Sequence, residues 1–129
     1  MSKIILDTSA WIEYFIGSEK GKKIREKIKD SEETLFISGM IAQELCVKFM
    51  KEGKQASEVI AMVSMLSKLI PFNYSLAEEG AEIYLVQRKN KSKCSIIDAH
   101  IVAAARLMGG KVITCDHDFS GLSEVIIIK

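Results

Sequence analysis

Apolar residues recur along this chain in two alternating patterns, short β-branched runs and longer stretches with helical spacing. The short runs predict strands at residues 3–6, 34–38, 70–72, 111–114 and 124–128. The helical spacing predicts helices at residues 9–16, 19–30, 39–53, 56–69, 75–90 and 95–110. Because strands alternate with helices, we predict an α/β fold with a central, mainly parallel sheet of about five strands and helices on both faces.

Local signals at helix ends support this division of the chain. Ser75 and Glu78 have the spacing of a capping box, which predicts a helix that opens at Ser75. Ser95 and Asp98 come close to the same arrangement at the start of the most apolar helix. A glycine follows several of the predicted helices, as expected for a helix C-terminus.

Five of the 17 acidic residues occupy related places in this pattern. Asp7 ends the first strand, and Asp116 and Asp118 follow the strand at residues 111–114. Asp98 lies in the first turn of the helix that leads into the strand at residues 111–114, and Glu44 lies in the first turns of the helix after the second strand. Right-handed crossovers bring all strand-to-helix loops to one edge of a parallel sheet, where α/β folds bind ligands. The acids are therefore predicted to converge at that edge.

Each acid also has a purely local explanation. Asp7 is a suitable helix N-cap, and Asp98 fits the capping box. Asp116 and Asp118 suit a polar turn, and Glu44 suits a solvated helix surface. None of these explanations accounts for the convergence. Carboxylates held close together repel one another unless a cation compensates, and such oxygen clusters suit Mg²⁺ or Mn²⁺. We therefore expect one or two of these ions at the site.

Composition narrows the class of protein. The chain has 129 residues, 48% of them hydrophobic, and predicts a single domain over residues 1–129. It contains no membrane-length apolar run and no signal-peptide pattern, so we expect a cytoplasmic protein without membrane contact. The three cysteines have no zinc or disulfide spacing. With a net charge of +1, binding of nucleic acid would require local basic patches.

Four motifs occur in order and at suitable spacing: IILDTSAWIEYF, ISGMIAQEL, SIIDAHIVAAA and VITCDHDF. Together they resemble the PIN-domain ribonucleases, particularly the VapC-type toxins of toxin–antitoxin pairs, over essentially the whole chain. The resemblance implies a three-layer α/β/α sandwich. It also implies the catalytic set Asp7, Glu44, Asp98 and Asp116. The sequence departs from the family at Cys115, where a small or apolar residue is frequent, and we interpret this thiol as a buried spacer.

The resemblance further implies hydrolysis of RNA phosphodiesters that depends on Mg²⁺ or Mn²⁺ and leaves 5′-phosphate and 3′-hydroxyl ends. Asp7, Asp98 and Asp116 would ligate the metal. Ser9, Thr114 and Asp118 match supporting positions, and Thr114 is expected to orient a carboxylate or water. A homodimer and an antitoxin partner are implied as well. The methionine-rich segment Met40–Leu69 suits the groove that accepts an antitoxin helix in this family.

Substrate contacts are less well defined by the sequence. The run RKNKSK places Arg88, Lys89, Lys91 and Lys93 just before the helix that carries Asp98. These cations are suited to gripping phosphates, but an ordinary solvated loop explains them equally well.

Two other functions compete with the nuclease hypothesis. One is a phosphotransfer or phosphatase domain in which Asp7 is a covalent nucleophile. Haloacid-dehalogenase-like enzymes have an acid two residues after that nucleophile, and here the position is Ser9. The other is a non-catalytic interaction module with a relict site, against which the complete set of four acids argues.

Overall fold

The computed structural model describes residues 3–30, 34–119 and 121–129. The elements, in chain order, are β1 (Lys3–Leu6), α1 (Thr8–Ile16), α2 (Glu19–Asp30), β2 (Thr34–Ile37), α3 (Gly39–Met50), α4 (Ala56–Leu66), β3 (Lys68–Leu69), α5 (Tyr74–Lys89), α6 (Ile96–Met108), β4 (Lys111–Thr114), the 3₁₀ helix η1 (His117–Phe119) and β5 (Val125–Ile127). The five strands form one sheet with the order β3-β2-β1-β4-β5, and all neighbouring pairs are parallel.

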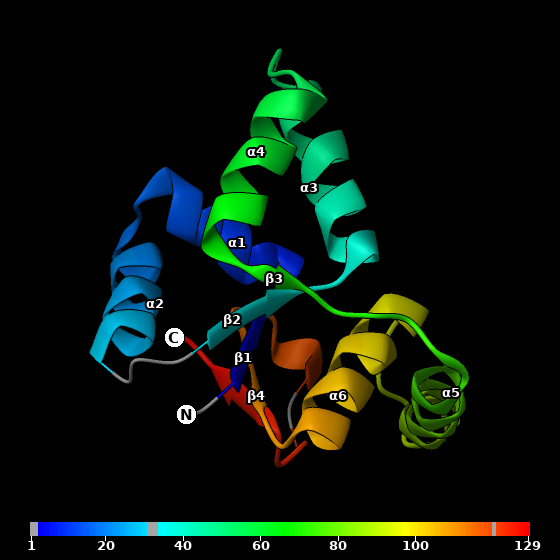
Figure 1. Cartoon of the computed structure of the whole chain (residues 1–129). Coiled ribbons are helices and arrows are strands. Elements are labelled where there is room, and N and C mark those ends of the chain that lie inside the picture. Colours follow the sequence, from blue (N-terminus) through cyan, green and yellow to red (C-terminus); the bar gives the residue numbers. More distant parts are fainter. Residues whose placement is uncertain (1–2, 31–33, 120) are drawn as a thin grey trace.

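Helices cover both faces of this sheet, as predicted. Helices α1 and α2 lie on one face, and α6 lies on the other with α5 packed outside it (Figure 1). The α3–α4 hairpin stands beyond the sheet, next to α1. The predicted α/β/α architecture with about five parallel strands is therefore confirmed.

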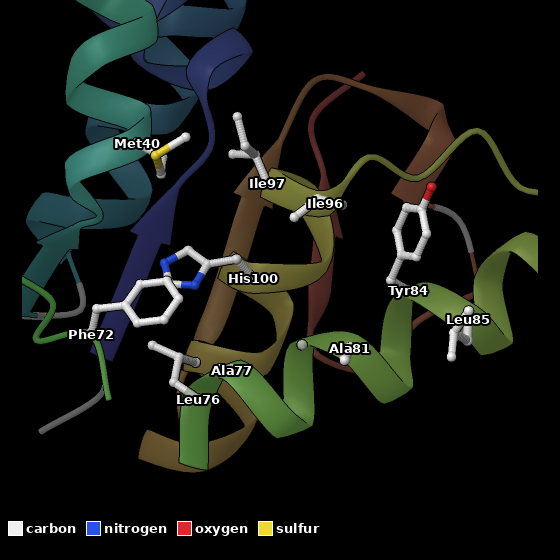
Figure 2. A pocket seen from close by; sticks show the side chains of 11 residues that line it. Met40, Phe72, Leu76, Ala77, Ala81, Tyr84, Leu85, Ile96, Ile97 and His100 are labelled. Carbon is white, nitrogen blue, oxygen red and sulfur yellow. The ribbon is translucent and has the colours of Figure 1, made fainter. Parts of the chain in front are cut away.

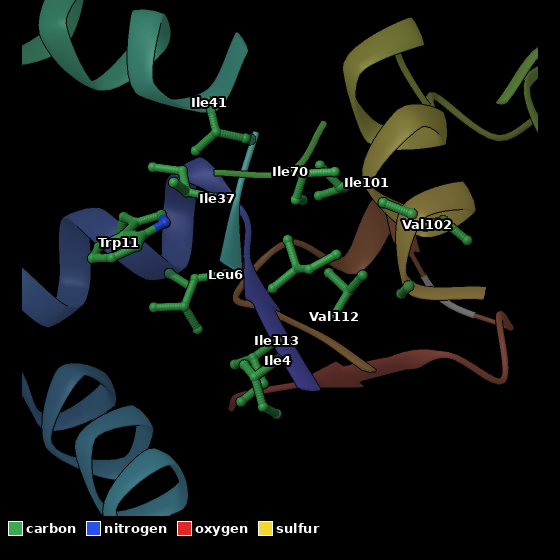
Figure 3. Packing of buried hydrophobic residues seen from close by; sticks show 14 of the residues in the cluster. Ile4, Leu6, Trp11, Ile37, Ile41, Ile70, Ile101, Val102, Val112 and Ile113 are labelled. Carbon is green, nitrogen blue, oxygen red and sulfur yellow. The ribbon is translucent and has the colours of Figure 1, made fainter. Parts of the chain in front are cut away.

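Side chains of the central strands point alternately to the two faces of the sheet and form a hydrophobic core on each face. Leu6 of β1 pairs with Ile113 of β4, while Ile5 pairs with Val112, so the two pairs point to opposite faces. Figure 3 shows Leu6 on the side of Trp11 and α1, and Val112 on the side of α6. All these side chains are buried. Strands buried on both faces read as continuous apolar runs, which explains why KIIL and KVIT were recognisable in the sequence.

The third strand lies earlier than predicted. We expected residues 70–72, but β3 is Lys68–Leu69, paired with Phe36 and Ile37 of β2. Both residues of β3 are exposed at the sheet edge, so no apolar run marks them. Pro71 lacks the amide proton that a continuing ladder would use. Ile70 supplies a last bond from its N–H to the carbonyl of Ile37, 2.8 Å long, and the chain then leaves the sheet.

Several helix boundaries also differ from the prediction. Helix α5 begins at Tyr74 because Asn73 is its N-cap and accepts a 2.9 Å bond from Leu76 N–H, so the capping box expected at Ser75 and Glu78 is wrong. Helices α3 and α4 end at Met50 and Leu66, three residues before the predicted ends. The box formed by Ser95 and Asp98 is confirmed.

Among the described residues, none of the helices combines the length and apolar character that a membrane crossing demands.

Candidate functional site

The site is built around Asp7, which directly follows the central strand β1. The carboxylate is 5% exposed and is held on both oxygens. Its Oδ1 accepts bonds from Ser9 Oγ at 2.7 Å and from Ala10 N–H at 2.9 Å, and its Oδ2 accepts one from Thr114 Oγ1 at 2.5 Å. The N-cap explanation of Asp7 is therefore correct, but it accounts for only one of the two oxygens.

Hydroxyl groups tie the end of β4 to this carboxylate. Thr114 Oγ1, fully buried, also accepts a 2.9 Å bond from Asp116 N–H. Ser9 Oγ accepts a 3.1 Å bond from Cys115 N–H. The side chains of Ser9 and Thr114 therefore link the carboxylate of Asp7, at the end of β1, to the backbone of Cys115 and Asp116, at the end of β4. Thr114 was expected to orient a carboxylate or a water, and the carboxylate to which it donates is that of Asp7.

Asp116 shapes the turn that follows it. Its Oδ1 accepts a 2.9 Å bond from Asp118 N–H, and the chain continues into the 3₁₀ helix η1. The turn explanation for this pair therefore holds as well. Asp118 itself is exposed. The pKa of the nearby Cys94 thiol is raised mainly by burial, and the charges of Asp98 and Asp118 add to that rise.

Asp98 enters the site from the start of α6. Its Oδ2 accepts a 3.0 Å bond from Ser95 N–H, and Ser95 Oγ accepts one from Asp98 N–H at the same distance. Burial raises the pKa of Asp98, its bonds with Ser95 oppose that rise, and the negative charges of Asp116 and Glu44 add to it. Asp98 therefore lies within electrostatic range of acids from two other elements.

Glu44 reaches the same region from α3. It is exposed, and its Oε1 accepts a 2.5 Å bond from Thr8 Oγ1, the first residue of α1. This bond joins α3 to the residue that follows Asp7.

The pKa of Asp7 completes the picture of a crowded acidic site. Burial raises this pKa most strongly, the three hydrogen bonds to Oδ1 and Oδ2 lower it, and the charge of Asp98 raises it further. Asp98 is thus the carboxylate that interacts with each of the other three. The structure brings Asp7, Glu44, Asp98 and Asp116 to one edge of the sheet, as the topology argument predicted.

The donor set fits a hard divalent cation in its chemistry. All the converging groups are carboxylates or hydroxyls, and two of the carboxylates are raised in pKa by burial and mutual repulsion, which a cation would relieve. In residues 3–30, 34–119 and 121–129, no group of three or more histidine, cysteine, aspartate or glutamate side chains is arranged as a complete metal-binding set. The residues therefore offer the ligand type, and a bound ion would require their side chains to rearrange.

The two neighbouring cysteines, Cys94 and Cys115, both have raised pKa values. Burial raises the pKa of Cys94 to about 11, and the charge of Asp98 adds to this rise. Burial also raises the pKa of Cys115, with a further contribution from Asp7. Since the thiolate is the reactive form, these thiols are poor nucleophiles. Cys115 was expected to be a buried spacer, but its side chain is only partly buried.

The basic run lies next to the last motif. Ser92 Oγ donates a 3.3 Å bond to the carbonyl of Asp118. The Arg88 guanidinium lies 5.7 Å from the ring centre of Tyr84, while Lys89, Lys91 and Lys93 are exposed. Arg88 and Lys89 lie in the last turn of α5, and Lys91 and Lys93 lie in the loop that follows it. This basic segment, residues 88–93, is therefore at the border of the site, and its three lysines are exposed.

An apolar cavity of about 500 Å³ beside Asp98 was not predicted. Ile96 and Ile97, which precede Asp98, line it together with Met40, Phe72 and His100 (Figure 2). The rings of Phe72 and His100 are stacked 5.1 Å apart, and burial lowers the pKa of His100. The cavity joins α3, α5, α6 and the segment before α5, and no sequence signal links residues so distant along the chain.

Comparisons with known proteins were made on both sequence and structure. The sequence matches the family model described as PIN domain over residues 4–125. No curated protein shows significant sequence similarity to the chain.

Several solved structures share the fold. A toxin–antitoxin complex from Klebsiella pneumoniae is similar with a TM-score of 0.74 and 23% identity, covering 98% of both chains. VapBC2 from Rickettsia felis, bound to a DNA fragment from its promoter, has a TM-score of 0.76 at 14% identity, covering 97% of this chain and 96% of that one. VapC20 from Mycobacterium tuberculosis, a sarcin–ricin loop cleaving toxin, has a TM-score of 0.72 at 21% identity, covering 98% and 99%.

Proposed function

This chain belongs to the PIN domain family, and from that premise we propose that it is a metal-dependent endoribonuclease, the toxin of a toxin–antitoxin pair. One observation carries the proposal: four carboxylates from four different elements converge at the carboxyl edge of the sheet, with Asp98 in electrostatic contact with the other three. Asp7 is buried, and Asp7 and Asp98 have pKa values raised by burial and by neighbouring negative charge. Carboxylates placed in this way lower the stability of the fold, so their presence favours a functional role.

The proposed ligands of Mg²⁺ or Mn²⁺ are Asp7, Asp98 and Asp116, with Glu44 completing the catalytic set. A divalent ion, when bound, supplies positive charge beside the phosphate and makes a nearby water more acidic. Thr114 and Ser9 would keep Asp7 oriented toward the ion through the bonds they already donate to it. Asp118 would support Asp116 through the turn. One or two ions are compatible with this set.

Substrate binding is proposed for the basic loop. Arg88, Lys89, Lys91 and Lys93 would contact phosphates that flank the cleaved bond. The bond from Ser92 to Asp118 supports this role, because it keeps the loop beside the carboxylates.

An antitoxin is the proposed protein partner. The relatives from Klebsiella and Rickettsia were crystallised as toxin–antitoxin or VapBC complexes. Between α1 and the α3–α4 hairpin lies a cavity of about 260 Å³, lined by Phe15, Phe49 and Met62 among others. Met62 and Met65 of α4 are exposed. Flexible methionines beside an aromatic groove suit an amphipathic helix.

A homodimer is proposed across the face shown in Figure 2. Phe72, Leu85 and Ile96 are 65–70% exposed there, around the rim of the apolar cavity. Large apolar side chains that remain exposed together mark an interaction surface. This face borders Asp98, so pairing would bring two sites near each other.

The nuclease proposal is tested by replacing its carboxylates. Asp7→Asn and Asp98→Asn should each lower metal-dependent cleavage of RNA by at least about 100-fold, since even outer-shell partners of metals are worth 10–100-fold. Cleaved ends should carry 5′-phosphate and 3′-hydroxyl groups when mapped, and growth arrest on expression should be relieved by Asp7→Asn. Glu82→Gln, an exposed acid on α5, is the matched control and should keep full activity.

Two further measurements distinguish the nuclease from a non-catalytic module and from a phosphotransfer enzyme. In thermal unfolding, Mg²⁺ or Mn²⁺ should raise the melting temperature of the unmodified protein and have a smaller effect on Asp98→Asn. A protein that gains stability from the metal but cuts no RNA would instead be a non-catalytic module. A phosphoryl group trapped on Asp7 would indicate phosphotransfer chemistry.

A further inference from the structure

A second groove opens directly from the carboxylate site. This cavity of about 470 Å³ has Thr8 and Ile97 at the end nearest Asp7 and Asp98, and it extends along α3. Its α3 wall includes Glu44, Lys48 and Lys51. The groove is therefore continuous with the site through Glu44, the residue that Thr8 already binds.

Helical geometry puts the three charged residues of this wall in one line. Glu44, Lys48 and Lys51 have the spacing i, i+4 and i+7, which places them on the same helix face. At 1.5 Å per residue, Lys51 lies about 10 Å beyond Glu44 along the axis of α3. The groove thus begins at an acidic end and becomes cationic with distance from the site.

The lysines are available to a ligand. Both are exposed, and Lys48 forms a long 3.8 Å ion pair with Glu52, in which both side chains are about half exposed. Exposed pairs of this kind are weak and yield readily to a phosphate. Lysines near a helix C-terminus also complement the helix dipole. The dipole, however, does not explain why these two line the same cavity as Glu44.

The phosphate that is cleaved and the adjoining phosphates of the same RNA strand require protein surroundings of opposite charge. The cleaved phosphate would sit where carboxylates hold a cation, whereas the next phosphates along the strand carry uncompensated negative charge. A surface that changes from carboxylates to lysines along one groove meets both needs. Gln43, exposed on the same wall, adds amide groups that can bond to bases or sugars.

We infer that the α3 groove holds single-stranded RNA leaving the carboxylate site, with Lys48 and Lys51 each contacting a phosphate. This deepens the proposed function and rests on it. The groove is separate from the basic loop at Arg88–Lys93, so the substrate would be held by cations from two distant parts of the chain.

The test measures binding of fluorescein-labelled U12 RNA by anisotropy, in the Asp7→Asn background so that the RNA stays intact. Lys48→Gln/Lys51→Gln should weaken binding about tenfold at 0.1 M salt. The slope of log K against log salt should fall by about 1.4, because each contact to a single strand contributes about 0.7.

The matched control is Lys27→Gln/Lys29→Gln on the exposed face of α2, which removes the same charge. It should leave the slope unchanged. Equal weakening by both pairs, an unchanged slope in the groove variant, or no binding of U12 by any form would overturn the inference.

Failure of the proposed function gives a different result. In that case the unmodified protein with Mg²⁺ or Mn²⁺ would cut no RNA, although U12 would still bind through the groove. Conversely, full cleavage activity in Lys48→Gln/Lys51→Gln with unchanged U12 binding would leave the nuclease in place and remove the groove from its substrate path.

Discussion

At the scale of single residues, the hydroxyl proton of Thr114 determines the directions of the hydrogen bonds around Asp7. A hydroxyl has one proton to donate, and that of Thr114 goes to Asp7 Oδ2. Ser9 likewise donates to Asp7 Oδ1. The 3.4 Å approach of the two hydroxyl oxygens is therefore a contact without a proton between them. The lone pairs of both remain for Asp116 N–H and Cys115 N–H.

Replacing Thr114 tests this arrangement. Thr114→Val keeps the shape but leaves Asp116 N–H without its acceptor and Asp7 Oδ2 without its donor. We expect a loss of about 1–3 kcal/mol in the free energy of unfolding, measured in urea. The Thr114 bond lowers the pKa of Asp7, so the acid limb of the cleavage profile should move to higher pH. Thr114→Ser, which keeps the hydroxyl, should retain the profile; a profile equally displaced in Thr114→Ser would contradict the account.

Because the pKa of Asp98 is raised, its ionised carboxylate lowers the free energy of unfolding at neutral pH. Burial raises this pKa above the ordinary value of 3.8, so the folded protein binds a proton more readily than the unfolded chain. The contribution of Asp98 is then fully favourable below 3.8 and is lost as pH rises through the higher folded pKa.

Asp98→Asn should therefore be more stable than the unmodified protein at pH 7 in the absence of divalent metal. The asparagine oxygen can still accept the bond from Ser95 N–H, so the cap is kept. In thermal melts from pH 3 to pH 8, the advantage should vanish at the acidic end, where the carboxyl is protonated. A constant difference across that range would show that the charge is not its cause.

At the scale of elements, the crossing of α1 and α2 depends on Gly21. A Cβ atom at this position would lie 2.0 Å from the carbonyl oxygen of Glu13, a main-chain atom that cannot rotate away. Helix α1 starts at the site with Thr8 and Ser9. The close crossing therefore fixes the helix from which two of the site's hydroxyls project.

Gly21→Ala should push α1 and α2 apart. Overpacking of this kind costs about 1–3 kcal/mol, to be measured by urea unfolding. Gly39→Ala is the matched control, because that glycine is also helical and has no heavy atom near its Cβ position. It should gain about 0.4–1 kcal/mol by restricting the unfolded chain. Equal stability of the two variants would show that the crossing is not tight.

The elements also show where sequence reasoning succeeds. β1 and β4 are buried on both faces, so their apolar runs predicted them well, and topology then predicted the place of Asp7 and Asp116. β3 was misplaced because two exposed edge residues have no apolar signature and are held only by pairing with β2. The apolar cavity and the α3 groove were out of reach for a related reason: each is made by residues that only the folded chain brings together.

At the scale of the molecule, charge and apolar surface are divided between different faces. The lysines of α3 and of the loop after α5 border the carboxylates, while exposed apolar side chains gather around the cavity of Figure 2 and on the α3–α4 hairpin. A net charge of +1 conceals this division. The α3 groove and the apolar cavity nevertheless adjoin, because Met40 and Ile97 line both of them. Under the proposed function, RNA and a second copy of the chain would therefore bind side by side around one site.

Leu85→Glu tests the proposed dimer face. Leu85 lines the apolar cavity and is 65% exposed, so a charge there should convert the dimer to monomer in sedimentation equilibrium at micromolar concentration. Leu69→Glu is closely matched, since Leu69 is also 65% exposed but lies on the edge strand β3. It should leave the dimer intact. A monomeric unmodified protein, or dissociation by both variants alike, would exclude this face.

The pairing of β1 with β4 has a consequence for synthesis. Thr114 and Asp7 are 107 residues apart, so a ribosome that adds ~5–20 residues per second needs ~5–20 s to make the second partner after the first. β1 can pair with β2 early, but until β4 docks Asp7 lacks the strand that carries Thr114, and Asp98 and Asp116 have not yet joined it. During that interval the nascent chain therefore carries no assembled carboxylate site. Under the proposed function, a cell would have this time in which to supply the partner that restrains the enzyme.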